Sequence, residues 1–118
     1  MYKLEKDCIF CKIASGEIGT EFLYESDDIV AFRDLNPQAP THILLIPKKH
    51  IPKISEIKKE DEALIGKMID VANLLAAKEN ILENGYRMVF NCGKDAGQEV
   101  FHIHLHLLGG RKMIWPPG

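Results

Sequence analysis

Residues 101–110 read FHIHLHLLGG and place three histidines at alternate positions, with an apolar residue in every gap. This alternation predicts a β-strand, because successive side chains of a strand point to opposite faces. His102, His104 and His106 would then share one face, and Ile103, Leu105 and Leu107 would share the other. Three imidazoles that titrate near neutral pH on one face are typical of a nucleophile flanked by proton carriers, or of a metal site.

Size and charge narrow the class of protein. The chain has 118 residues, of which 27% are charged, and a formal net charge of −2. We therefore expect one domain over residues 1–118, with no nucleic acid or membrane partner. No organic cofactor is expected either. No apolar run approaches the ~20 residues of a membrane span, and the charged residues 1–7 differ from a signal peptide, so we expect a cytoplasmic protein.

The rest of the pattern predicts an α+β domain, with a mostly antiparallel sheet and one long helix. Asp7 can cap a short helix through about Ser15, with Gly16 as its end. Strands are expected over residues 22–25, 29–33, 42–47 and 86–91, and a long helix over residues 59–78. A loop with two prolines spans residues 35–40, and a glycine-bearing loop over residues 92–98 leads into the histidine stretch.

The histidine stretch, the loop before it and the C-terminal sequence WPPG at residues 115–118 together resemble the histidine triad (HIT) superfamily, and its Hint branch most closely. The sequence DLNPQAPTH at residues 34–42, the pair Gly97-Gln98 and the sequence GGR at residues 109–111 add support. The resemblance covers residues 9–118. It implies a HIT-like fold with a short N-terminal helix, and a homodimer whose sheet is continuous across the two subunits.

By the same resemblance, His104 is the nucleophile that takes a nucleoside monophosphoryl group, and His106 and His42 lie beside the phosphate. There they would donate hydrogen bonds to its oxygens or relay a proton to the leaving amine. A lone histidine more often has only a structural role. The complete trio, with Thr41-His42 upstream, favours catalysis.

The resemblance also implies a nucleotide site. Its base wall is apolar: Ile9, Phe10, Ile13, Phe32, Leu35 and Leu44. Each of these is also a plausible core residue. Its phosphate side comprises Asn91, Gly97, Gln98, Glu99 and Val100. Asp34 is the candidate ribose anchor, because a carboxylate can accept from both ribose hydroxyls, or else it caps the turn that follows.

Glu99 departs from the family pattern, since some relatives carry a small hydroxyl residue there that contacts the phosphate. A carboxylate would repel an anion at contact distance. Glu99 therefore either turns outward, so that only its amide helps, or it handles the leaving amine.

Cys8 and Cys11 form a C-x-x-C pair, which is a weak metal signal because zinc takes four ligands. The resemblance supplies His50 and His102 as the other two, giving a closed, structural zinc site. The alternatives are a reduced thiol pair or, with less support, a redox motif. The odd total of three cysteines argues against a disulfide framework, and Cys92 is interpreted as a small apolar residue.

The resemblance implies a purine nucleoside phosphoramidase that hydrolyses the P–N bond of AMP-amine conjugates such as AMP-lysine, on AMP or GMP nucleotides. The WPPG end would lie near the active sites and the dimer interface and shape the leaving-group preference, or it is a frayed terminus. Two other functions stay open. One is a dinucleoside polyphosphate hydrolase of the Fhit-like branch, and the other is a nucleotide-binding interaction module with incidental turnover.

Overall fold

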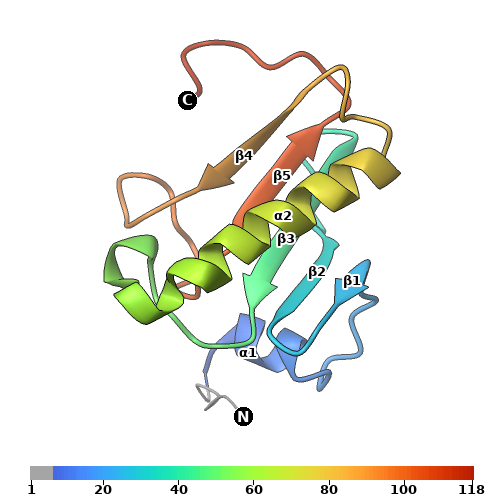
Figure 1. Cartoon of the computed structure of the whole chain (residues 1–118). Helices are drawn as coiled ribbons and strands as arrows, with labels where there is room; N and C mark the ends of the chain where they lie inside the picture. The colour runs from blue at the N-terminus through green and yellow to red at the C-terminus, as the bar shows by residue number, and fades with distance from the viewer. Residues whose placement is uncertain (1–6) are drawn as a thin grey trace.

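The computed structural model describes residues 7–118 and is built on one five-stranded antiparallel sheet (Figure 1). The charged start of the chain, residues 1–6, lies outside the described residues. The strands have the order β1-β2-β3-β5-β4. Their bounds are Tyr24–Glu25 (β1), Ile29–Arg33 (β2), Thr41–Pro47 (β3), Tyr86–Phe90 (β4) and Leu105–Gly109 (β5). The expected α+β architecture is confirmed.

Helices cover the two faces of this sheet. The long helix α2, Glu62–Lys78, crosses one face, and the short helix α1, Ile9–Ala14, lies at the other near the ends of β2 and β3 (Figure 1). Alternate residues of β3 therefore belong to different cores: Ile43 and Leu45 pack with α2, while Leu44 and Ile46 pack with Phe10 of α1. Both faces of β3 are covered, which explains why all seven of its residues are buried.

The two longest elements begin close to their predicted positions. β3 begins at Thr41, one residue before the predicted start, and it is central as expected. A 3-10 turn, Lys59–Asp61, precedes α2, so the α-helix proper starts at Glu62. Asp61 holds this start, because its carboxylate accepts the Lys58 backbone N–H at 2.9 Å and the Lys49 ammonium at 2.6 Å. Among residues 7–118, no helix is long and apolar enough to cross a membrane.

The histidine stretch was predicted to be one continuous strand, and this was wrong in its first half. β5 begins at Leu105, so that His102 and His104 precede the sheet ladder. The ladder to β3 ends at the pair Leu45–Leu105, and the backbone N–H of Ile103 donates to Ile51 outside the sheet. The alternation of faces nevertheless continues, since Ile103 lies in the same core as Leu105 and Leu107.

The cap of α1 also differs from the prediction. Cys8, not Asp7, is the N-cap: its extended backbone (φ −91°, ψ 115°) lets its sulfur accept the Cys11 backbone N–H at 3.3 Å. The predicted end is confirmed, because Ser15 is the C-cap and Gly16 follows with φ of 85°. One cysteine therefore starts the helix and also turns its sulfur toward a second cysteine on the same helix.

Candidate active site

One cavity is lined by nearly all the residues that were predicted to be catalytic or to bind the nucleotide. It has a volume of about 500 Å³ and lies on the α1 side of the sheet. Its lining includes every predicted catalytic and nucleotide-binding residue except Gln98: Ile9, Phe10, Ile13, Phe32, Asp34, Leu35, His42, Leu44, Asn91, Gly97, Glu99, Val100, His104 and His106. Arg33, Asn36 and Gln38 also line it and were not predicted.

His104 is held in one tautomer by the backbone. Its Nδ1 lies 2.9 Å from the carbonyl oxygen of His102, and a carbonyl can only accept, so Nδ1 carries the proton. In the neutral ring Nε2 then has a lone pair and no proton. Burial lowers the pKa of His104, which keeps the ring neutral near pH 7. The ring is thus an imidazole whose free nitrogen is a nucleophile.

His42 and His106 form a chain of hydrogen bonds that begins at the backbone of the 35–40 loop. The Gln38 backbone N–H donates to His42 Nδ1 at 3.0 Å, so the proton of neutral His42 is on Nε2. That nitrogen lies 2.9 Å from His106 Nδ1, which must accept, and this places the His106 proton on Nε2. His106 Nε2 is buried and has no hydrogen-bond partner among residues 7–118. A buried N–H without a partner is costly, so this donor is available to a ligand.

Burial favours neutral rings in this chain, and it outweighs the opposing charge of Asp34. Burial lowers the pKa of His106 to about 4, and His104 and His42 act in the same direction. Burial also lowers the pKa of His42, although the Asp34 carboxylate opposes the shift. His42 Nε2 has two possible acceptors, Asp34 Oδ2 at 3.4 Å and His106 Nδ1 at 2.9 Å. We assign its N–H to the shorter hydrogen bond, in which His106 Nδ1 is the acceptor.

The GGR sequence at residues 109–111 supports this chain from outside the cavity. Arg111 Nε donates to the Gln38 carbonyl at 2.9 Å. Gly110 has φ of 91°, and a Cβ there would lie 2.9 Å from Pro40, so the position requires glycine. The role of Gln38 was missed because it acts through its backbone. Its place between Asp34 and His42 in a proline-bounded loop was the one available signal.

Asp34 makes the turn contact that was considered as an alternative. Its Oδ1 accepts the Asn36 backbone N–H at 2.8 Å. Its second oxygen faces His42, and the side chain is half-buried at the cavity wall. Turn formation and a ligand contact are therefore compatible in this residue.

The glycine-bearing loop closes on itself through Gln98. The Gln98 side chain accepts the Gly93 backbone N–H at 2.8 Å and donates to the carbonyls of Pro52 and Val100 at 2.8 and 3.0 Å. It is buried, which explains why it does not line the cavity. Glu99 is exposed and lines both this cavity and a neighbouring one that it shares with Asp7 and His50.

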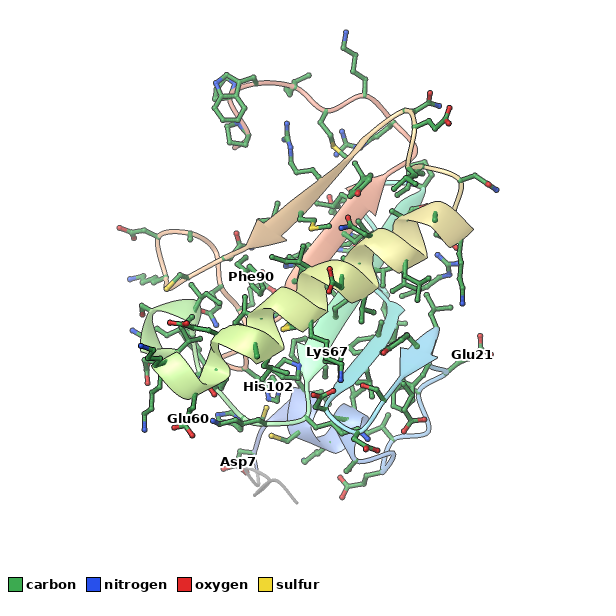
Figure 2. All side chains as sticks on the ribbon, viewed as in Figure 1. Asp7, Glu21, Glu60, Lys67, Phe90 and His102 are labelled. Atoms are coloured by element: carbon green, nitrogen blue, oxygen red, sulfur yellow. The ribbon has the colours of Figure 1, made fainter. Side chains whose placement is uncertain are left out.

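A cluster of cysteine and histidine side chains lies beside the cavity, where His102 meets α1 (Figure 2). Its members, Cys8, Cys11, His50 and His102, place one ligand atom each within 4.8 Å of all the others. His102 Nδ1 lies 3.3 Å from Cys8 Sγ and 3.2 Å from His50 Nδ1, and Cys11 Sγ lies 3.3 Å from His50 Nδ1. A tetrahedral zinc ion with these ligands sets its ligand atoms roughly 3.3–3.8 Å apart, so the cluster has the dimensions of a zinc site.

The proton positions in this cluster also fit a metal. His102 Nε2 lies 2.7 Å from the Pro47 carbonyl and must donate to it, so Nδ1 presents a lone pair to the sulfurs. Burial lowers the pKa of His102 to about 4, so the ring is neutral, as a metal ligand must be. None of the three cysteines forms a disulfide within residues 7–118. Cys92 lies apart from the cluster. A hydrogen bond with Ser55 lowers the pKa of its thiol.

Three comparisons agree with this geometry. Residues 15–113 match the family model described as HIT domain. The chain is 47% identical to the purine nucleoside phosphoramidase of Escherichia coli K12 over 110 residues. The aligned region covers 93% of this chain and 92% of that protein. A HIT family hydrolase from Legionella pneumophila Philadelphia 1 is 54% identical, with a TM-score of 0.93 over 95% of this chain and 100% of that one. A histidine triad protein from Clostridium difficile is 44% identical, with a TM-score of 0.91 over 95% and 97% of the two chains.

The fold and the site define a hydrolase of the histidine triad type. The chain belongs to the HIT domain family. The resemblance read from the histidine stretch, the 34–42 loop and the GGR sequence is confirmed.

Proposed function

We propose that this hydrolase cleaves the P–N bond of purine nucleoside 5′-phosphoramidates, such as adenosine 5′-phosphoramidate and AMP-lysine. One observation carries the proposal: the His102 carbonyl holds the proton of His104 on Nδ1, and this leaves a free lone pair on Nε2 in a ring that lines a cavity of about 500 Å³. Such a cavity has the volume of a small-molecule site. The name of the 47% identical relative supports the substrate class.

The reaction has two steps. His104 Nε2 attacks phosphorus, the P–N bond breaks with its electron pair passing to the departing nitrogen, and that nitrogen leaves as an amine after taking a proton from solvent. Water then attacks the nucleotidyl-His104 intermediate, which releases the nucleoside monophosphate and returns the lone pair to Nε2.

His106 stabilises the charge on the phosphoryl oxygens in both steps, through its buried Nε2–H. His42 holds that proton in place by donating to His106 Nδ1. A hydrogen bond to oxygen is favoured over outright proton transfer, because a neutral imidazole that gives up its proton becomes an imidazolate anion.

The remaining cavity residues would bind the nucleotide, in either AMP or GMP form. Asp34 accepts from the ribose hydroxyls with the oxygen that faces His42. The base packs against the apolar wall, in which Phe10 and Phe32 already contact each other with ring centroids 5.9 Å apart. Asn91, Gly97, Glu99 and Val100 form the phosphate side, and Gln98 contributes by closing their loop.

We also propose that Cys8, Cys11, His50 and His102 hold a structural zinc ion. When bound, the ion supplies a cross-link between α1 and the segment that leads into β5. The spacing of the ligand atoms and the lone pair on His102 Nδ1 support this assignment. The metal has no part in either chemical step, because four protein ligands close its coordination sphere.

The functional form is proposed to be a homodimer of one HIT domain, residues 1–118, with a sheet continuous across the subunits. β4 is an edge strand of the sheet, and an edge strand offers unpaired backbone groups to a second copy. The exposed apolar side chains of the described residues include Ile69, Leu74, Leu82, Ile114 and Trp115. Trp115 is 81% exposed, and its segment runs out beyond β4, away from α1 (Figure 1), so in this proposal the WPPG end serves the partner's site.

The test is steady-state hydrolysis of adenosine 5′-phosphoramidate and a diadenosine polyphosphate, side by side, with His104→Ala as the control. We expect faster P–N cleavage by the native protein and a loss of about 10⁴-fold or more in the variant, because removal of a nucleophile has this effect. The variant should still bind AMP.

Two outcomes would contradict the proposal. A preference for the dinucleotide would make the protein a polyphosphate hydrolase. Turnover of neither substrate by protein that binds AMP would favour a nucleotide-binding interaction module.

A further inference from the structure

Helix α1 and its N-cap contribute side chains to both the proposed metal site and the hydrolase cavity. Cys8, its N-cap, and Cys11 belong to the proposed metal site, whereas Ile9, Phe10 and Ile13 line the hydrolase cavity. α1 has only six residues, too few to be stable by helix formation alone. Its position therefore depends on what holds its two ends.

Phe10 is the contact between these two sets of residues. Its ring is 7% exposed and packs edge-on against two histidines, with centroids 5.0 Å from His104 and 6.0 Å from His102. Phe32 lies on another side, at 5.9 Å. A displacement of α1 would therefore change the wall of the cavity and the packing around His104 together.

His102 is a second link between the sites. Its ring nitrogen Nδ1 faces the sulfurs of Cys8 and Cys11 at 3.3 and 3.5 Å, while its carbonyl holds the Nδ1 proton of His104 at 2.9 Å. The ring and the carbonyl belong to one residue that lies outside the sheet ladder. A metal that holds the ring therefore restrains the same residue whose carbonyl holds the His104 proton.

We infer that Cys8, Cys11 and His102 are positioning residues for the hydrolase cavity, so that metal binding at their cluster and nucleotide binding in the cavity strengthen each other. The inference rests on the proposed function and on the proposed zinc site. Metal pins α1 and His102 in the nucleotide-competent arrangement, and the apparent nucleotide affinity rises with the fraction of molecules in that arrangement. Thermodynamic linkage requires the nucleotide to raise the metal affinity by the same factor.

The experiment measures both halves of this linkage with the full chain. Zinc affinity is measured by competition with a chromophoric chelator, with and without saturating AMP, and AMP affinity is measured by calorimetry on zinc-loaded and zinc-depleted protein. We expect AMP to tighten zinc by about tenfold, and zinc to tighten AMP by the same factor, within the usual range of coupling between sites.

Two variants separate positioning from general stability. Phe10→Leu keeps every metal ligand but removes the ring contacts to His102 and His104. AMP should bind more weakly to this variant, because Phe10 also lines the base wall, and zinc should still bind. The ratio of AMP affinities with and without zinc should fall toward one. Cys92→Ala removes a thiol outside the cluster and should leave the coupling unchanged.

Each adverse result has its own meaning. Zinc and AMP that both bind with affinities independent of each other would overturn the inference and leave the proposed function intact. Failure of zinc to bind would overturn the inference together with the metal site. Failure of AMP to bind zinc-loaded protein would overturn the inference and the proposed function together.

Discussion

Two clusters of side chains lie on the α1 side of the sheet, and both bring candidate metal ligands within 4.8 Å of one another. One contains Cys8, Cys11, His50 and His102, and the other contains Asp34, His42 and His106. In the first, the atoms that converge are sulfurs and a ring nitrogen without a proton. In the second, the ring nitrogens are already joined by hydrogen bonds. The geometry of the first favours a cation, and that of the second favours hydrogen-bond donation to a ligand.

The difference is decided by the partner of the other ring nitrogen in each histidine. His102 donates from Nε2 to a carbonyl, so its lone pair on Nδ1 faces the thiols. His104 donates from Nδ1 to a carbonyl, so its lone pair is on Nε2. His106 accepts at Nδ1, so Nε2 keeps a proton. Three histidines spaced two residues apart thus have three different chemical roles.

Substitutions in the two clusters should differ most in their effect on metal content and on stability. Cys11→Ser is expected to abolish metal binding and to lower the free energy of unfolding by several kcal/mol, because zinc binding contributes directly to folding. His42→Gln should retain about one zinc per chain. Metal analysis of untagged protein and thermal unfolding measure both effects. Folded native protein with free thiols and no metal would contradict the assignment of the first cluster.

The second cluster should respond in rate rather than in metal content. His106→Gln is expected to lower kcat for adenosine 5′-phosphoramidate by about 10²-fold, since it removes the buried Nε2–H. Single-turnover kinetics with zinc-loaded protein would measure it. An unchanged kcat in this variant would show that the His42–His106 chain has no part in the chemistry.

The pH dependence of stability should show whether the fold holds the His42–His106 chain of hydrogen bonds neutral. The pKa of His106 is lowered to about 4 from an ordinary value near 6.5. The unfolded chain then binds the proton more readily, so the stability is fully present above about pH 6.5 and is lost as the pH falls toward 4. Urea unfolding between pH 4.5 and 7.5 measures the slope.

His106→Gln serves as the matched control for this slope, because both proteins keep the metal ligands. The variant should show a shallower loss of stability than native protein between pH 6.5 and 4.5. Equal slopes in the two proteins would mean that His106 is not held neutral by the fold.

Glu99 should give the smallest effect, at the boundary between the two clusters. Its exposed carboxylate lines both cavities and opposes an anionic phosphoryl group. Glu99→Gln should raise kcat/KM for a phosphoramidate with a neutral leaving amine by up to about fivefold, as expected for an exposed charge. The gain should shrink at high salt. A loss of activity in this variant would show instead that Glu99 assists the leaving amine.

The sequence predicted the bounds of an element well where neighbouring residues along the chain set its ends. The strand over residues 29–33 was predicted with the observed bounds, since its apolar run is bounded by the polar turn at 26–28. The start of β5 was missed because it depends on where the ladder to β3 ends and on the Pro47 carbonyl, which binds a histidine ring. The cap of α1 was missed because a cysteine sulfur replaced the expected carboxylate.

By itself, the sequence determined the family and the antiparallel α+β layout, and the family resemblance supplied the four residues of the Cys8–Cys11–His50–His102 cluster. Alternating and helical spacings are local, and the HIT sequence pattern names the residue types that the chemistry requires. Only the tertiary structure decided which nitrogen of each histidine carries the proton, that Gln38 acts through its backbone, and that α1 contributes to the metal cluster and also contacts His104. These properties depend on atoms far apart in the chain that meet only after folding, so no spacing along the sequence can express them.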